Sequence, residues 1–136
     1  MPRKPSVIRD AKDVYESFKG IARYRKERVY AVLLEGDEVN VLGVEEVSKG
    51  SDGYVDAYPD QVFSLALEKH CRSLILVHNH PSGFPYPSDR DREATRNLYR
   101  DGRKLGIEVV DSVIVALGGY YSFDESGALQ AWREEK

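Results

Sequence analysis

The sequence has almost no cysteine and no long apolar run. Cys71 is the single cysteine among 136 residues, which excludes an internal disulfide, cysteine-rich zinc sites and the two-cysteine zinc site of nucleobase deaminases. The longest apolar runs have about six or seven residues, far fewer than the ~20 that a membrane-spanning helix needs. Because the first residues also lack the apolar stretch of a secretory signal, we expect a cytoplasmic protein without membrane contact.

The sequence also lacks a dominant basic charge. The formal net charge is −3, although residues 1–28 and 90–104 are basic and residues 29–68 are acidic. A protein that binds nucleic acid usually carries one dominant basic face. We therefore interpret the basic segments as solvated faces, with a modest basic patch as the alternative, and the charge does not support a nucleic-acid partner.

The apolar pattern predicts one domain, spanning residues 1–136, in which helices and strands alternate. Residues at helical spacing predict helices over 10–20, 59–72, 89–105 and a short segment around Trp132. Apolar or alternating runs predict strands over 29–34, 38–48, 73–77, 107–117 and 120–123, with a loop at 49–53. This order predicts an α/β fold in which a mixed β-sheet is packed between helices.

Local signals refine these boundaries. Asp10 is a candidate helix N-cap, and Gly36-Asp37 is typical of a tight hairpin turn. Gly43 weakens the second strand and indicates a bulge, whereas Gly106 suits the position just after a helix. We expect Leu105 to face inward from the end of that helix.

Two histidines follow an apolar strand. The run 74–77 predicts a buried strand, and side chains alternate between the two faces of a strand. His78 and His80 should therefore point the same way, whereas Asn79 points the other way. Pro81 ends the strand. Two imidazoles on one side of a strand end can bind one metal ion.

A carboxylate follows at a spacing that suits either metal binding or helix capping. Ser88 marks the start of the predicted helix, and Asp91 lies in its first turn. His78, His80 and Asp91 would leave a fourth tetrahedral position open, which is the pattern of a catalytic zinc site. The spacing Ser88-x-x-Asp91 is also a capping box, and the sequence leaves both readings of Asp91 open.

A zinc-activated water needs a base, and glutamate is the usual one in such hydrolases. The base should lie at the end of a strand next to the 74–77 strand. Glu27, at the start of the first buried strand, meets this condition, although its basic neighbours leave a solvated loop as the alternative. Glu35 and Glu68 are weaker candidates.

Three other residues could carry chemistry. A Cys–His protease built from Cys71 would need a histidine free of the metal, and we interpret His70 as a surface residue. Asp111 is either an acceptor for a ligating histidine or a strand-end acid satisfied by the backbone.

These residues together resemble the JAMM (MPN+) metalloproteases, which are marked by Glu, then His-x-His-Pro, then Ser-x-x-Asp. Within that superfamily the chain most resembles the RadC family of bacterial proteins, over roughly residues 7–127. The resemblance rests on His78–Gly83, Pro85, Pro87-Ser88, Asp91, Thr95 and Leu98, and on the later Val110-Asp111 and Tyr121–Phe123.

The resemblance implies a cytidine-deaminase-like (JAMM/MPN) fold and one Zn²⁺ per chain, held by His78, His80 and Asp91. It implies a protease or isopeptidase of protein or peptide substrates, with Glu27 as the general base and Ser88 stabilising the oxyanion. The family's association with DNA repair gives the alternative of an accessory or nucleic-acid-binding module without protease activity. Exposed sheet edges make a homodimer a further expectation.

The chain departs from the family pattern in three respects. The N-terminal helical domain with a helix-hairpin-helix is expected to be absent. Phe84 and Tyr86 replace the family's common Asp or Asn and Thr, and Ser112 replaces a histidine. The predicted metal ligands are retained, whereas a substrate or partner shared with the family is left open.

Overall fold

The computed structural model describes residues 4–49 and 59–135. Its elements are α1 (Ala11–Phe18), the 3₁₀ helix η1 (Lys19–Arg23), β1 (Arg28–Leu34), β2 (Val41–Lys49), α2 (Pro59–Glu68), β3 (Ser73–Asn79), α3 (Asp89–Lys104), β4 (Glu108–Ala116), β5 (Gly119–Ser122) and α4 (Ala128–Arg133). The predicted loop at 49–53 lies, apart from its first residue, outside the described residues. Within the described ranges, no helix is long and apolar enough to cross a membrane.

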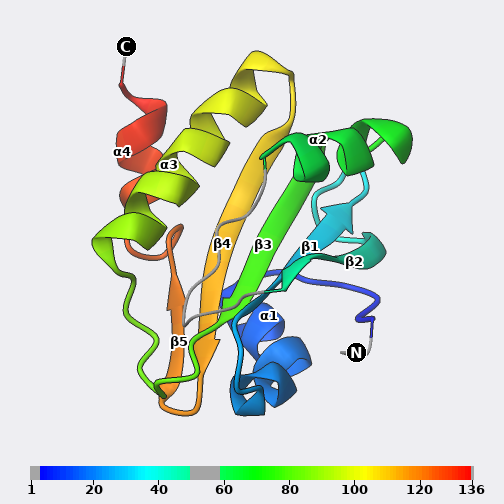
Figure 1. Ribbon diagram of the computed structural model, residues 1–136. Helices are drawn as coiled ribbons and strands as arrows, with labels where there is room; N and C mark the ends of the chain where they lie inside the picture. The colour runs from blue at the N-terminus through cyan, green and yellow to red at the C-terminus, as the bar shows by residue number, and fades with distance from the viewer. Residues whose placement is uncertain (1–3, 50–58, 136) are drawn as a thin grey trace.

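The strands form one mixed sheet in the order β2-β1-β3-β4-β5. β1 runs antiparallel to β2 and β3, β3 runs parallel to β4, and β5 is antiparallel to β4. α3 makes the crossover between the two parallel strands (Figure 1). Parallel neighbours need such a crossover, and it brings the start of α3 back over the end of β3.

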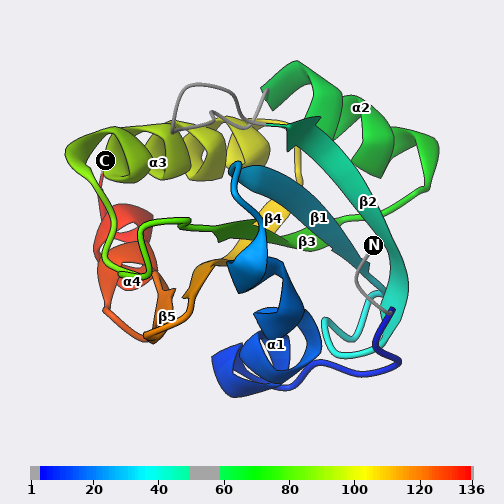
Figure 2. The same cartoon turned by 60° about the horizontal axis from the view of Figure 1, so that its bottom comes forward.

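Helices cover both faces of the sheet (Figure 2). α1 and η1 bury Phe18 and Ile21 against one face, and α2, α3 and α4 pack on the other. The predicted α/β architecture, a mixed sheet between helices, is confirmed. β3 is buried along its whole length, so the residues at its end are held by a rigid support.

Several local predictions hold. The Asp10 side chain caps α1 by accepting a hydrogen bond from the backbone N–H of Asp13 at 2.9 Å. The β1–β2 register shifts next to Gly43, which confirms an irregularity there. Gly106 follows α3 with a φ of +76°, a conformation in which a Cβ would be strained.

Three predicted boundaries or faces were wrong. β2 starts at Val41 rather than at residue 38, because the preceding residues pair with the N-terminal segment around Ile8. α2 ends at Glu68 rather than at residue 72, because His70 turns the chain with a φ of +56°. Leu105 is half exposed, and the buried face of α3 uses Thr95, Leu98, Tyr99 and Gly102 instead.

Candidate metal centre

Three predicted ligands converge where β3 ends and α3 begins. The Nε2 atoms of His78 and His80 lie 3.3 Å apart, and His80 Nε2 lies 3.1 Å from Asp91 Oδ2. His78 Nε2 lies 3.7 Å from Asp91 Oδ1. The structure thus brings together an imidazole pair and a carboxylate that ten residues separate in the sequence.

These spacings suit a tetrahedral metal ion. Donor atoms about 2.1 Å from a tetrahedral centre lie about 3.4 Å from one another. The two imidazole nitrogens, at 3.3 Å, and the pair His80 Nε2 and Asp91 Oδ2, at 3.1 Å, are close to this value, and one donor atom from each of the three residues lies within 4.8 Å of the others. Two nitrogen donors and one carboxylate oxygen leave one position of a tetrahedron open. The side chains His78, His80 and Asp91 could therefore hold a metal ion, and their donor set fits zinc.

The loop after β3 fixes the orientation of His80. Its Nδ1 lies 2.9 Å from the carbonyl oxygen of Phe84, an acceptor, so Nδ1 carries the proton in this contact. The lone pair of a neutral imidazole is then on Nε2, the atom that faces His78 and Asp91. A metal-binding histidine typically has such a partner for its other nitrogen.

Asp91 is both a capping residue and a member of the cluster. Its Oδ2 accepts a hydrogen bond from the backbone N–H of Ser88 at 2.9 Å, and Ser88 Oγ accepts from the N–H of Asp91 at 3.0 Å. This capping box holds the carboxylate against the histidines. The two readings that the spacing left open are therefore compatible, because one side chain satisfies both geometries.

The pKa shifts of His78 and Asp91 favour metal binding at neutral pH, whereas the shift of His80 opposes it. Burial of His78, opposed by Asp91 and assisted by His80, lowers its pKa to about 4. Burial would raise the pKa of Asp91, but the hydrogen bond from His80, the charge of His78 and the Ser88 N–H outweigh it and lower the pKa to about 2. Burial opposes protonation of His80, yet the contacts with Asp91 and Phe84 raise its pKa.

Glu27 lies beside the same cluster. Val29 pairs with His78, so extending the antiparallel register by two residues sets Glu27 opposite His80. Glu27 is buried, and its charge contributes to the raised pKa of His80. Glu35 follows the far end of β1, about 20 Å from His78 at 3.3 Å per strand residue, and Glu68 ends α2 before the start of β3, at the same far end of the sheet. These positions remove both as candidate bases.

Asn79 is a site residue that sequence reasoning missed. It is fully buried on the other side of the strand, where its Oδ1 accepts from the backbone N–H of Arg28 at 2.7 Å. Its Nδ2 donates to the carbonyls of Lys26 and Tyr24 at 3.1 and 3.4 Å. Asn79 thereby holds the segment that carries Glu27. Its position between two candidate ligands was the only feature of the sequence that could have indicated this role.

An open cleft of about 470 Å³ lies over the cluster. Its walls are formed by the segment before β1, by the loop after β3 and by the start of α3: Arg25, Glu27, His80, Pro81, Ser82, Phe84, Tyr86, Pro87, Ser88 and Asp91. Phe84 and Tyr86 are 69% and 72% exposed, so their rings stand at the rim. These two departures from the family pattern therefore lie at the mouth of the cleft.

The remaining candidates lie outside the site. Cys71 is buried, with its sulfur near the carbonyls of Leu34 and Ser73, whereas His70 is exposed. Asp111 accepts hydrogen bonds from Ser112 N, Ser122 Oγ and Asp124 N at 2.7, 2.6 and 2.9 Å. It therefore stabilises the strand end and the following turn, and the alternative role as acceptor for a ligating histidine was wrong.

Comparison with known proteins gives a consistent result. The family described as "RadC-like JAB domain" matches residues 8–128. A UPF0758 protein of Symbiobacterium thermophilum is 45% identical over 103 residues, which cover 76% of this chain and 44% of the relative. A UPF0758 protein of Thermotoga maritima is 35% identical over 129 residues, covering 95% of this chain and 58% of the relative. The chain thus spans about half the length of these curated relatives.

Proposed function

The chain belongs to the RadC-like JAB domain family, and from this membership and the site geometry we propose that it is a zinc-dependent hydrolase of peptide or isopeptide bonds. The observation that carries the proposal is the convergence of one donor atom from each of His78, His80 and Asp91 to within 4.8 Å of one another, with a buried glutamate beside them. His78, His80 and Asp91 would hold one Zn²⁺ per chain.

A zinc ion bound there would supply Lewis-acid chemistry, polarising a carbonyl and lowering the pKa of a water to about 7. Glu27 acts as the general base in this proposal. Its carboxylate takes the proton of the attacking water and returns it to the leaving amine. Glu27 suits this role because it faces the cleft from the strand next to the ligands.

Ser88 has two roles in the proposal. Its oxygen accepts the capping hydrogen bond from the N–H of Asp91, and a hydroxyl that accepts one hydrogen bond still has a proton to donate. The residue lines the cleft, so this proton can be directed at the oxyanion that develops on the scissile carbonyl.

A protein or peptide is the proposed substrate. The cleft is open rather than closed around a small molecule, and the exposed rings of Phe84 and Tyr86 offer flat apolar contacts to an extended chain. Arg25 adds a cation on the same wall. These features favour a polypeptide that passes across the site over a buried small substrate.

The proposal is tested by metal analysis and a cleavage screen on one set of proteins. The wild type should carry about one zinc per chain, Glu27→Gln should retain it and Asp91→Ala should lose it. A peptide-library screen should then detect cleavage by the wild type and a loss of about 10²–10⁴-fold in Glu27→Gln. A wild type that binds no zinc in zinc-replete buffer, or equal cleavage by both proteins, would contradict the proposal.

A further inference from the structure

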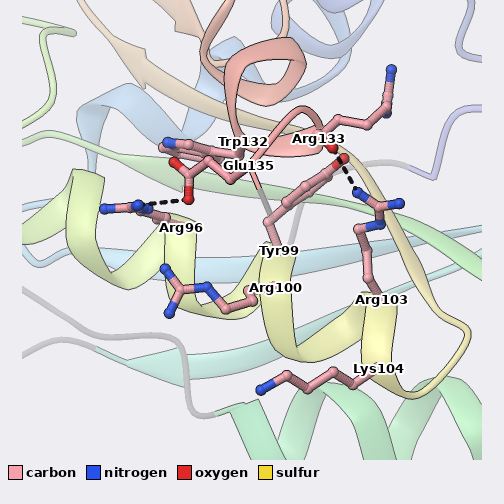
Figure 3. Close-up of a pocket in the computed structure, with 8 residues that line it drawn as sticks. All are labelled: Arg96, Tyr99, Arg100, Arg103, Lys104, Trp132, Arg133 and Glu135. Atoms are coloured by element: carbon pink, nitrogen blue, oxygen red, sulfur yellow. Dashed lines mark hydrogen bonds and ion pairs between the residues drawn. The ribbon is translucent and has the colours of Figure 1, made fainter.

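A second recess lies between α3 and α4, away from the metal centre (Figure 3). This α3–α4 groove has a volume of about 570 Å³. Its walls carry five cationic side chains, Arg96, Arg100, Arg103, Lys104 and Arg133, and one acid, Glu135. The chain as a whole has a net charge of −3, so the groove concentrates charge of the opposite sign.

Internal contacts account for only part of this charge. Arg96 pairs with Glu135 at 2.6 Å, Arg133 pairs with Glu108 at 3.2 Å, and Arg103 donates to the carbonyl of Arg133 at 3.4 Å. Arg100 and Lys104 form no ion pair with any residue that the structure describes. The groove therefore has cationic donors to spare.

The position of these charges on α3 is not explained by the helix itself. Arg103 and Lys104 lie in the last turn, where basic side chains complement the helix dipole. Arg96 and Arg100 lie earlier, and with Lys104 they form an i, i+4, i+8 stripe in which like charges repel by about 0.2–0.5 kcal/mol per pair. An anion bound along this stripe would remove that repulsion.

The groove already holds a carboxylate of its own chain. The Glu135 side chain lies on the guanidinium of Arg96, as the dashed contact in Figure 3 shows. The floor also includes the ring of Tyr99, whose buried hydroxyl interacts with the guanidinium of Arg133. Guanidinium groups are donors that suit carboxylates.

We propose that the α3–α4 groove binds a short acidic peptide segment and docks the polypeptide substrate of the metal centre. A peptide fits better than a nucleic acid, because a phosphate backbone needs a long continuous basic track. Here Glu135 and Glu108 pair with two of the cations, Arg96 and Arg133. The basic area is therefore limited to one stripe of α3 and the end of α4. Two or three carboxylates match the cations that remain.

The groove is close enough to the metal centre to share one substrate chain. Asp91 and the basic stripe lie on the same helix, and at 1.5 Å per residue Arg96 and Lys104 are about 8 and 20 Å along its axis from Asp91. An extended polypeptide covers this axial distance with about two to six residues, and it needs a few more to pass around the helix, because Arg100 lies about 180° around the axis from Asp91. The docking role rests on the proposed hydrolase function, whereas peptide binding to the groove does not.

The test measures binding without catalysis. A fluorescein-labelled glutamate octapeptide is titrated with the protein after a chelator has removed metal, so that carboxylates at the metal centre do not contribute. Fluorescence anisotropy should show binding that weakens as salt rises. The double variant Arg100→Glu/Lys104→Glu should bind at least tenfold more weakly, and because both side chains are exposed, the fold should be retained.

The matched control is Arg9→Glu/Lys12→Glu, which makes the same change of charge at exposed positions beside α1. It should bind the octapeptide as the wild type does. Equal binding by the groove variant and the wild type, an equal loss in the control, or tighter binding of a labelled oligothymidine that displaces the peptide would each overturn the proposal. Loss of zinc or of cleavage with peptide binding intact would instead contradict only the hydrolase function.

Discussion

The Nδ1 atom of His80 lies 2.9 Å from the carbonyl oxygen of Phe84, so a loop residue determines which nitrogen of a candidate ligand is available to a metal. That loop is itself supported by the β4–β5 turn, because the backbone N–H of Gly118 donates to the carbonyl of Gly83 at 3.0 Å. A chain of contacts therefore runs from the turn, through the loop, to the ligand.

Gly118→Ala should weaken metal binding without touching a ligand. A Cβ at position 118 would lie 2.8 Å from the carbonyl oxygen of Gly83, closer than side chains tolerate, so the loop that carries Phe84 must shift. Loss of a hydrogen-bond partner of a ligating histidine typically costs about 10–100-fold in metal affinity. Competition with a chromophoric zinc chelator measures this change.

Gly36→Ala is the control for this substitution, since nothing lies within 4 Å of a Cβ added at that position. Its zinc affinity should equal that of the wild type. If Gly118→Ala also binds zinc as the wild type does, the support that the turn gives to His80 is unimportant for binding.

Asn79→Leu should separate metal binding from catalysis. The substitution keeps a similar volume but removes the acceptor for Arg28 N and the donor to Lys26 O, which position Glu27. Each buried backbone group left without a partner costs about 1–3 kcal/mol, so the free energy of unfolding should fall. Zinc content should stay near one per chain, whereas kcat in the proposed cleavage should drop.

A purely structural role for Asn79 would leave the catalytic pH profile in place. We expect the acidic limb of kcat/KM, which reports ionisation of the base, to shift in Asn79→Leu. Asn97→Ala, which removes an exposed asparagine from α3, should leave zinc content, stability and the profile unchanged. A profile identical to that of the wild type would limit Asn79 to a structural role.

The sequence predicted the strands and the convergence of His78, His80 and Asp91 because both follow from local spacing. Alternation along β3 placed His78 and His80 on one face, and Ser88-x-x-Asp91 located the helix start. The spacing did not show whether Asp91 is a metal ligand or a helix cap, because its carboxylate can do both. One oxygen accepts the hydrogen bond from the backbone N–H of Ser88, and the other faces His78. The local sequence pattern and the tertiary contacts therefore identify the same residues at this site.

Long-range contacts explain what the sequence did not predict. The partners of Asn79 lie more than 50 positions away, and no periodicity reports them. The end of α2 depends on a local feature, the left-handed backbone conformation of His70, which a histidine in the sequence does not predict. The α3–α4 groove exists only because the short last helix packs against Tyr99, with the Trp132 and Tyr99 rings 6.1 Å apart.

The stability of the chain should depend on pH through Asp111. Burial of this carboxyl, partly offset by hydrogen bonds from Ser122, Asp124 and Ser112, raises its pKa from 3.8 to about 6. The folded state then binds more protons than the unfolded state between these values. The contribution of Asp111 to stability is therefore fully present below pH 4 and is lost as pH rises through 6.

Asp111→Asn removes this titration. The difference in the free energy of unfolding between wild type and Asp111→Asn should change with a slope of up to about 1.4 kcal/mol per pH unit between pH 4 and 6. The difference is the useful quantity, because His78 and Asp91 titrate in both proteins. Urea unfolding at a series of pH values measures it, and two parallel curves would show that Asp111 is not perturbed by burial.

Ser88→Ala should lower both stability and activity, and the two effects can be separated. The hydroxyl caps α3 through the N–H of Asp91, and loss of such a cap costs about 1 kcal/mol. Asp10→Ala removes the equivalent cap from α1, far from the cleft, and should cost a similar amount in thermal or urea unfolding. Only Ser88→Ala should also reduce kcat, by about 10²-fold if the hydroxyl stabilises the oxyanion.

Ser88→Thr provides the second comparison, because threonine keeps a hydroxyl that can both cap and donate. It should recover most of the stability and part of kcat, provided that the added methyl group fits at this exposed position. If Ser88→Ala and Asp10→Ala lose the same stability and neither loses activity, Ser88 acts as a cap alone. The oxyanion would then depend on other groups of the cleft, and the position of Asp91 would be the whole contribution of the capping box.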